Sequence, residues 1–182
     1  MTVKKKVFSG VLFDIYQREQ EQFDGSIKTF ELADRVNSAL VIPTVGDQIL
    51  VAYQTQPSKD YRYYGFVGGM VPRGVEESAQ AREELLEETG MSSDDRSLWK
   101  IYTASTKLDR QTHIYVARDC QRIAEPHLDP GGEKIEVRAV SFDEFVDLIC
   151  TDQLPLTHMR ADLLQMKFDG TLDQFRDFIF HG

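Results

Sequence analysis

A glycine pair followed by a glutamate-rich helix constrains this chain more than any other part of its sequence. Residues 68–91 read GGMVPRGVEESAQAREELLEETGM and hold six glutamates between Glu76 and Glu88. Apolar residues at helical spacing predict a helix over 78–89, and Gly90 supplies its C-terminal stop. Like charges three or four residues apart on a helix repel each other, so these carboxylates need water or a cation beside them.

Three of the glutamates share one edge of the predicted helix. At about 100° per residue, Glu84 and Glu88 lie one above the other and Glu87 lies beside them. Hard divalent cations such as Mg²⁺ take oxygen ligands and complete their shell with substrate phosphates. Glycine lets the backbone approach closely, so the carbonyl of Gly68 is a further candidate ligand. Taken alone, a glutamate-rich helix is more often a solvated acidic face than a metal site.

Most of the chain before this helix, and part of the chain after it, carries strand patterns. Runs rich in β-branched and aromatic residues occupy 7–16, 26–34, 38–54, 98–105, 112–119 and 133–142. Asp24 and Gly25 form a hairpin turn signal between the first two runs. The N-terminal part of the chain is therefore predicted to be sheet.

Helix signals concentrate toward the C-terminus. Ser141 and Glu144 form a capping box ahead of an apolar run. A second helix is predicted over 157–167 and a third after Thr171, where Gln174 completes another capping box. Because strands and helices mix without regular β-α-β alternation, the sequence predicts an α+β or layered α/β/α domain.

Composition and charge argue against several classes of protein. With a net charge of −9 over 182 residues and no basic stripe, the chain lacks the surface of a general nucleic-acid-binding protein. No window is apolar enough to span a bilayer, and the N-terminal residues lack a signal-peptide pattern. Cys120 and Cys150 have no C-x-x-C spacing, so no zinc site or disulfide framework is indicated. We expect a cytoplasmic protein without nucleic-acid or membrane partners.

Aligned on Gly90, the glycine–glutamate stretch resembles the Nudix hydrolase box, G-x5-E-x7-R-E-U-x-E-E-x-G-U, in which U is aliphatic. The matching residues are Gly69, Glu84, Leu85, Glu87, Glu88, Gly90 and Met91. The resemblance implies a Nudix-type α/β/α sandwich with a mixed sheet. It also implies that Glu84 and Glu88 are the principal metal ligands and that Glu87 is an auxiliary one.

Two positions depart from the box. Val75 stands where the first glutamate is expected, and Glu83 stands where the arginine is expected. Glu76 and Arg82 each lie one residue away from those positions. In the family these two residues mainly orient the loop and the metal-binding glutamate, so the departures bear on the geometry of the site more than on metal binding.

Beyond the box, the chain most resembles the Nudix branch of ADP-ribose pyrophosphatases and nucleoside-diphosphate-sugar hydrolases. That branch carries an N-terminal antiparallel strand pair, as in 7–16 and 26–34 here, and a Q-x-R-P stretch, matched by Gln54 and Pro57. Gln56 occupies the position of the substrate-contacting arginine. The resemblance places Gln54 and Gln56 among the substrate-binding residues.

A later loop supplies the candidate catalytic base. The stretch LDPGGEKIEV resembles D-x-G-E-x-I-E-V, whose glutamate maps to Glu133. The neighbouring glycines would let this loop bring a carboxylate to the attacking water, and Glu87 is the second candidate catalytic residue. The alternatives for the base are Glu136, Asp129 and Glu125.

The N-terminal residues are implicated in substrate binding and assembly. An aromatic face suits any nucleobase, and the candidates for it are Phe23 and Tyr16 here and Tyr61, Tyr63 and Tyr64 later in the chain. Arg18 is a candidate phosphate ligand. In the branch resembled, the N-terminal strands swap across a two-fold axis, which implies a homodimer. Residues 1–36 are then a dimerising strand extension, and residues 37–182 are the Nudix hydrolase domain.

The function implied is Mg²⁺-dependent hydrolysis of the pyrophosphate of a nucleoside diphosphate sugar, such as ADP-ribose. The products are a nucleoside monophosphate and a sugar phosphate, and Mn²⁺ is the alternative cation. Two other functions stay open: an RNA 5′-end pyrophosphohydrolase, and a degenerate Nudix domain that senses a nucleotide sugar without cleaving it. The acidic charge argues against the first, and the complete set of metal glutamates argues against the second.

Overall fold

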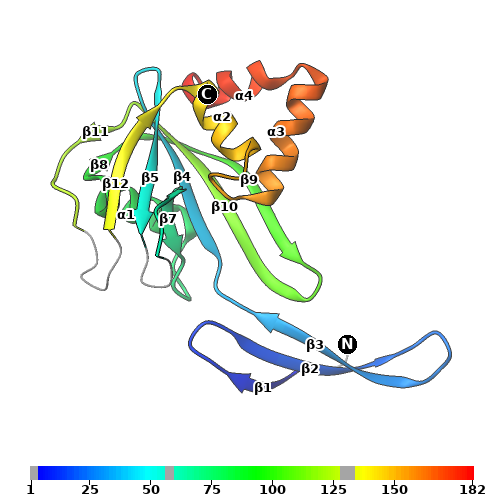
Figure 1. Cartoon of the computed structure of the whole chain (residues 1–182). Helices are drawn as coiled ribbons and strands as arrows, with labels where there is room; N and C mark the ends of the chain where they lie inside the picture. Colours follow the sequence, from blue (N-terminus) through cyan, green and yellow to red (C-terminus); the bar gives the residue numbers. More distant parts are fainter. Residues whose placement is uncertain (1–3, 56–59, 128–133) are drawn as a thin grey trace.

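The chain folds around one mixed β-sheet with helices on both faces (Figure 1). This computed structural model describes residues 4–55, 60–127 and 134–182. The strands are β1 (Lys5–Ser9), β2 (Asp14–Glu21), β3 (Ile27–Asp34), β4 (Ser38–Val45), β5 (Gln48–Thr55), β6 (Tyr63–Gly65), β7 (Val67–Met70), β8 (Met91–Ser92), β9 (Asp95–Ser105), β10 (Leu108–Arg118), β11 (Gln121–Arg122) and β12 (Lys134–Val140). The helices are α1 (Glu77–Thr89), α2 (Phe142–Cys150), α3 (Thr157–Asp169) and α4 (Leu172–Phe180).

The strand order confirms the predicted mixed sheet. The main path runs β1-β2-β3-β10-β4-β5-β12, with β9 beside β10, β7 beside β4 and β6 beside β5. β10 is parallel to β3 and β4, and the other pairs are antiparallel. β8 and β11 form a separate small sheet. Because β7 pairs with central β4, the glycine pair is held by the middle of the sheet.

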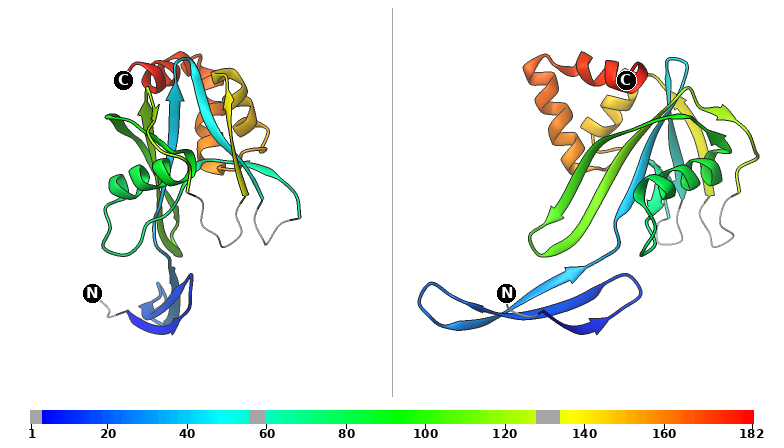
Figure 2. Two further views of the ribbon diagram at one scale, coloured as in Figure 1. Left: turned by 90° about the vertical axis from the view of Figure 1, so that its left-hand side faces the viewer. Right: turned by 180° about the vertical axis from the view of Figure 1, so that it is seen from behind.

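The helices cover the sheet in the predicted α/β/α arrangement. Figure 2 shows α1 on one face and α2, α3 and α4 on the other. On the first face, Ala81 and Leu85 of α1 are buried with Val41 and Val67. The larger core lies on the opposite face, and its largest buried side chains include Phe145, Phe175, Ile42, Ile114 and Leu163. The apolar face of α1 therefore fixes which of its glutamates point toward the sheet.

The N-terminal residues form a three-stranded ribbon that extends away from the domain (Figure 1). The predicted strand pair is present, but its bounds differ from those expected. The run at 7–16 divides at Gly10, whose N–H closes a turn onto the carbonyl of Phe13. The polar residues up to Glu21 continue β2, because an exposed ribbon needs no apolar alternation. β3 then joins the sheet, with Ala33 and Asp34 paired to β10.

The structure confirms two of the predicted helix-end signals and contradicts a third. The Ser141 capping box is confirmed, with hydrogen bonds in both directions between Ser141 and Glu144. Gly90 ends α1 in the left-handed conformation, as predicted, with φ of 68°. The capping box at Thr171 was a wrong prediction: its backbone has φ of −105° and ψ of 10°, and its hydroxyl accepts no capping bond. A cap needs extended backbone at that position so that the side-chain oxygen reaches the first turn.

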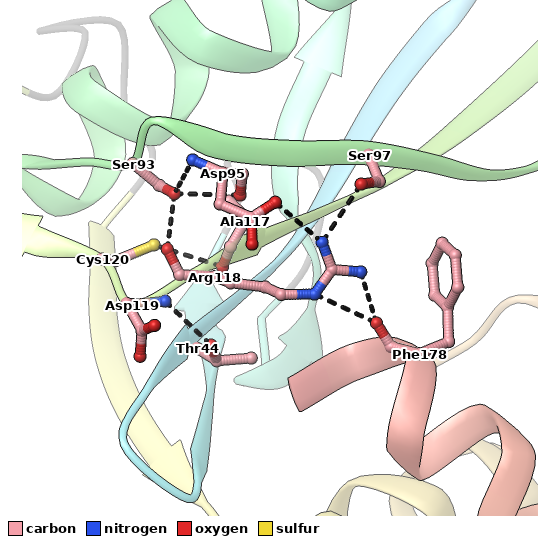
Figure 3. A network of polar contacts seen from close by, with 9 residues as sticks. All are labelled: Thr44, Ser93, Asp95, Ser97, Ala117, Arg118, Asp119, Cys120 and Phe178. Atoms are coloured by element: carbon pink, nitrogen blue, oxygen red, sulfur yellow. Dashed lines mark hydrogen bonds and ion pairs between the residues drawn. The ribbon is translucent and has the colours of Figure 1, made fainter. Parts of the chain in front are cut away.

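Arg118 ties the C-terminal helix to the sheet (Figure 3). Its side chain is buried, and its Nε donates to the carbonyl of Phe178 at 3.1 Å. Its Nη1 donates to Asp95 at 3.0 Å and to Ser97 at 3.1 Å. The guanidinium therefore satisfies a carbonyl near the end of α4, which has no partner within the helix, while its own charge is balanced. None of the helices in the described ranges is long and apolar enough to cross a membrane.

Candidate active site

The glutamates of α1 divide between an inward and an outward face. Glu77, Glu84 and Glu88 are partly buried against the sheet, together with the buried Gln80. These four residues recur at intervals of three or four, as one helical face requires. The other three glutamates of this stretch, Glu76, Glu83 and Glu87, are exposed. The six glutamates therefore form two groups: three belong to an inward polar stripe, and three lie on a solvated outer face.

Two inward glutamates face the glycine pair of β7. The backbone N–H of Gly68 donates to Glu88 Oε2 at 3.0 Å. At Gly69, an added Cβ would lie 2.3 Å from Glu84 Oε1, closer than any real contact. Gly69 is therefore needed because its missing side chain leaves room for the Glu84 carboxylate. The backbone and the helix carboxylates do lie close together, but the contact is made by the Gly68 N–H, and the role of the Gly68 carbonyl as a metal ligand stays a prediction.

Gly68 is required for a different reason. Its φ of 131° lies in a region that L side chains rarely adopt. An added Cβ there would also lie 2.3 Å from the carbonyl oxygen of Ala39 on β4. The two adjacent glycines thus have different roles: Gly68 permits the backbone conformation of the strand, and Gly69 leaves room for the Glu84 carboxylate.

The predicted metal ligands are only partly gathered. Glu88 accepts from Gly68 and Glu84 lies against Gly69, the next residue of β7, whereas Glu87 is exposed. Within the described ranges, no three His, Cys, Asp or Glu side chains are grouped closely enough to hold a metal ion. The donors that do converge are carboxylate oxygens next to strand backbone, and this all-oxygen set suits a hard cation such as Mg²⁺.

A neutral N–H donor holds each inward glutamate. Asn37 Nδ2 donates to Glu77 at 2.8 Å, and Gln80 Nε2 donates to Glu84 Oε1 at 2.9 Å. The Asn37 hydrogen bond lowers the pKa of Glu77. With the Gly68 N–H on Glu88, all three carboxylates receive an amide hydrogen bond that orients them.

Two arginines that sequence reasoning missed lie at the end of β7. β3 and β10 are parallel with Asp34 beside Asp109, so the next residues, Arg35 and Arg110, are neighbours. The Nε atom of each is buried without a hydrogen-bond partner among the described residues. Neither arginine forms an ion pair with a carboxylate within the described ranges. Burial and, second, the charge of Arg35 lower the pKa of Arg110.

Both guanidinium groups reach one position of the sheet. Arg110 Nη2 donates to Ser38 Oγ at 2.6 Å, and Arg35 Nη2 approaches Met70 Sδ at 3.5 Å. Ser38 and Met70 are paired across β4 and β7, one residue beyond Gly69. No sequence motif marks these arginines, because only the pairing of β3 with β10 makes them adjacent.

The predicted substrate-binding residues lie in different places. Gln54 is buried and donates to the hydroxyl of Tyr63 at 3.1 Å. Arg18 is on β2, away from α1 (Figure 1), and stacks 5.1 Å from the centre of the Phe30 ring. With Tyr16 it lines a pocket of about 520 Å³. Phe23 is fully exposed at the β2–β3 turn. Gln56 lies outside the described residues.

The candidates for the catalytic base differ in whether the structure describes them and in the hydrogen bonds they accept. Glu133 and Asp129 lie outside the described residues. Glu136 accepts hydrogen bonds from Arg138 at 2.8 Å and Arg62 at 3.0 Å, and the Arg138 bond first of all lowers its pKa. A carboxylate held by two arginines is a poor proton acceptor. Glu125 is almost fully exposed.

Comparisons with known proteins identify the family and the fold of this chain. The model of the NUDIX domain matches residues 34–160, a range that includes the glycine pair, α1 and β12. A solved structure described as the crystal structure of an ADP compounds hydrolase superposes with a TM-score of 0.71. It is 18% identical, and the match covers 93% of this chain and 96% of that chain, so the likeness is one of fold. A search of curated protein sequences found no match.

Proposed function

Because the chain belongs to the Nudix family, we propose that it hydrolyses the pyrophosphate bond of nucleoside diphosphate sugars of the ADP-ribose type. The products are a nucleoside monophosphate and a sugar phosphate. The observation that carries the proposal is the convergence of Glu84 and Glu88 on the glycine pair of β7. Two carboxylates oriented toward a gap in the backbone suit phosphate chemistry better than they suit a solvated helix face.

The reaction depends on a divalent cation, Mg²⁺ or in its place Mn²⁺. Glu84 and Glu88 would hold it, with the Gly68 carbonyl and Glu87 as further ligands. When bound, the cation neutralises charge on the phosphate oxygens and acidifies water. The amide hydrogen bonds on Glu84 and Glu88 hold these carboxylates in place before the cation arrives.

Other residues of the chain carry the remaining steps. Glu133, the residue before β12, accepts the proton of the attacking water. Arg35 and Arg110 supply positive charge for the substrate phosphates, because their orphaned Nε atoms and missing carboxylate partners among the described residues suit an anion. Gln54 and Gln56 contact the substrate from the end of β5.

The N-terminal ribbon completes the assembly. We assign residues 1–36 to a dimerising extension and residues 37–182 to the Nudix domain, with Arg18 and Phe23 reaching the partner's substrate. Large apolar side chains stand exposed on this ribbon: Phe8 is 58% exposed, Ile27 65%, Val11 102% and Phe23 115%. Apolar side chains gathered on one segment favour a protein–protein contact.

A substrate panel tests the function directly. The purified chain is incubated with Mg²⁺ and ADP-ribose, several nucleoside diphosphate sugars and a 5′-triphosphorylated RNA, in ¹⁸O-labelled water. We expect a nucleoside monophosphate and a sugar phosphate, with ¹⁸O in one of them, and loss of turnover in Glu88→Gln. No turnover of any diphosphate by folded protein would overturn the proposal.

A sensor is the second candidate function. The departures at Val75 and Glu83, and the absence of a three-carboxylate group among the described residues, favour it. Calorimetry with ADP-ribose separates the two functions. Tight binding with no product in the presence of Mg²⁺ selects the sensor.

A further inference from the structure

Gln80 is the one buried polar side chain in the first half of α1. It is 7% exposed, in a chain whose glutamines otherwise lie mostly at the surface. Its Nε2 donates to Glu84 Oε1 at 2.9 Å, one helical turn further along. A buried amide is unfavourable unless it is hydrogen-bonded, so this contact accounts for a glutamine at this position.

The direction of the bond matters for Glu84. The Glu84 oxygen that accepts from Gln80 is also the one closest to Gly69. A glutamate side chain has several staggered rotamers, and most of them would turn the carboxylate away from β7. The bond to Gln80 selects the rotamer in which the carboxylate faces the strand.

We infer that Gln80 is a positioning residue that holds the Glu84 carboxylate toward Gly69 and so preorganises the cation site. This inference rests on the proposed function. A neutral donor suits the task, because it fixes the carboxylate without cancelling the charge that binds the cation. An arginine or lysine at the same place would compete with the cation for Glu84.

The test measures cation binding without turnover. Mn²⁺ alone is titrated into the full chain and followed by electron paramagnetic resonance, for the wild type, Gln80→Met and Glu84→Gln. Methionine keeps the volume and removes the donor. Loss of a residue that orients a ligand weakens metal binding by roughly 10–100-fold, and we expect a loss in this range for Gln80→Met.

The chain offers a matched control on another helix. Gln165 Nε2 donates to Asp169 at 2.8 Å, with the same spacing of four residues, on the exposed side of α3. Gln165→Met removes the same kind of bond far from the glycine pair. Its Mn²⁺ affinity should equal that of the wild type.

A double variant separates positioning from general stability. In Glu84→Gln, the added change Gln80→Met should cause no further loss of Mn²⁺ affinity, because the carboxylate it positions is gone. If Gln80→Met folds poorly, Gln80→Asn, which is one methylene too short to reach Glu84, replaces it. In the enzyme, half-saturation by Mg²⁺ should rise while the substrate KM at saturating Mg²⁺ stays unchanged.

The outcomes distinguish this inference from the function on which it rests. If the wild type binds no Mn²⁺, the proposed function fails. If the wild type binds Mn²⁺ and Gln80→Met binds it equally well, the positioning role is refuted and the proposed function stands. Equal losses from Gln80→Met in the wild-type and Glu84→Gln backgrounds would also refute positioning.

Discussion

Substituting alanine for a glycine of β7 should have opposite effects at its two positions, Gly68 and Gly69. At Gly69, the atom that an added Cβ would strike is Glu84 Oε1, the end of a flexible side chain. That oxygen must retreat from 2.3 Å to the 3.4 Å of ordinary contact, a movement of about 1.1 Å. At Gly68, the atom struck is the carbonyl oxygen of Ala39, which belongs to the central strand and cannot retreat alone.

Gly69→Ala should therefore impair function and spare the fold. Gly69 does not have a positive φ, so alanine fits its backbone. Alanine also reduces the conformational entropy of the unfolded chain, and this stabilisation offsets part of the cost of the contact with Glu84. We expect the free energy of unfolding to change by less than about 1 kcal/mol. A misplacement of about 1 Å at a reacting site costs on the order of 100-fold in rate, and we expect kcat with ADP-ribose to fall by that factor.

Gly68→Ala should do the reverse. Its φ of 131° alone costs alanine about 1–3 kcal/mol, and the clash with Ala39 adds to that cost. Urea unfolding and steady-state kinetics on both variants check the pair. Gly69→Ala with unchanged kcat, or with a larger loss of stability than Gly68→Ala, would refute the assignment of the Gly69 gap to Glu84.

Three further outcomes follow from other parts of the structure. Arg110→Met removes a like charge beside Arg35 but also the hydrogen bond to the buried Ser38 hydroxyl, so the two effects on Tm oppose each other, while the KM for a diphosphate substrate should rise about 10-fold; the exposed Arg96→Met is the control. Ser141→Ala should cost about 0.5–2 kcal/mol in urea unfolding, whereas Thr171→Ala, at a helix start without a capping bond, should cost much less. Burial raises the pKa of Cys120 to about 11, so its thiol stays protonated at pH 8 and should resist iodoacetamide until the chain unfolds; rapid labelling of the native protein, located by peptide mass, would contradict this.

The strand and helix patterns in the sequence predicted most of the fold, because burial is periodic along the chain. The apolar stripe of α1 and the capping box at Ser141 are local signals, and both are realised in the structure. The start of the chain was harder to predict from sequence. β2 runs through polar residues to Glu21, since a ribbon exposed on both sides has no buried face to impose a pattern.

The candidate site was predictable where it depends on one helix and unpredictable where it depends on strand pairing. Glu84 and Glu88 share a helical face by spacing alone, and the glycine pair signals a close approach. The neighbouring positions of Arg35 and Arg110 follow from the parallel register of β3 and β10, residues more than seventy positions apart. Gln80 could have been found, because a glutamine four residues before Glu84 is the spacing of a helical hydrogen bond.

The two departures from the Nudix box fall on the solvent side of the structure. Val75 is 39% exposed in the loop before α1, and Glu83 is exposed on the outer face of the helix. The inward positions, by contrast, keep Glu84 and Glu88, and each receives a neutral N–H donor. Carboxylates that face a strand and are oriented by amide hydrogen bonds suit a cation site, and a domain that no longer binds a cation has no need of them. The location of the departures therefore favours an enzyme whose glutamates are oriented by amides over a domain that only senses its ligand.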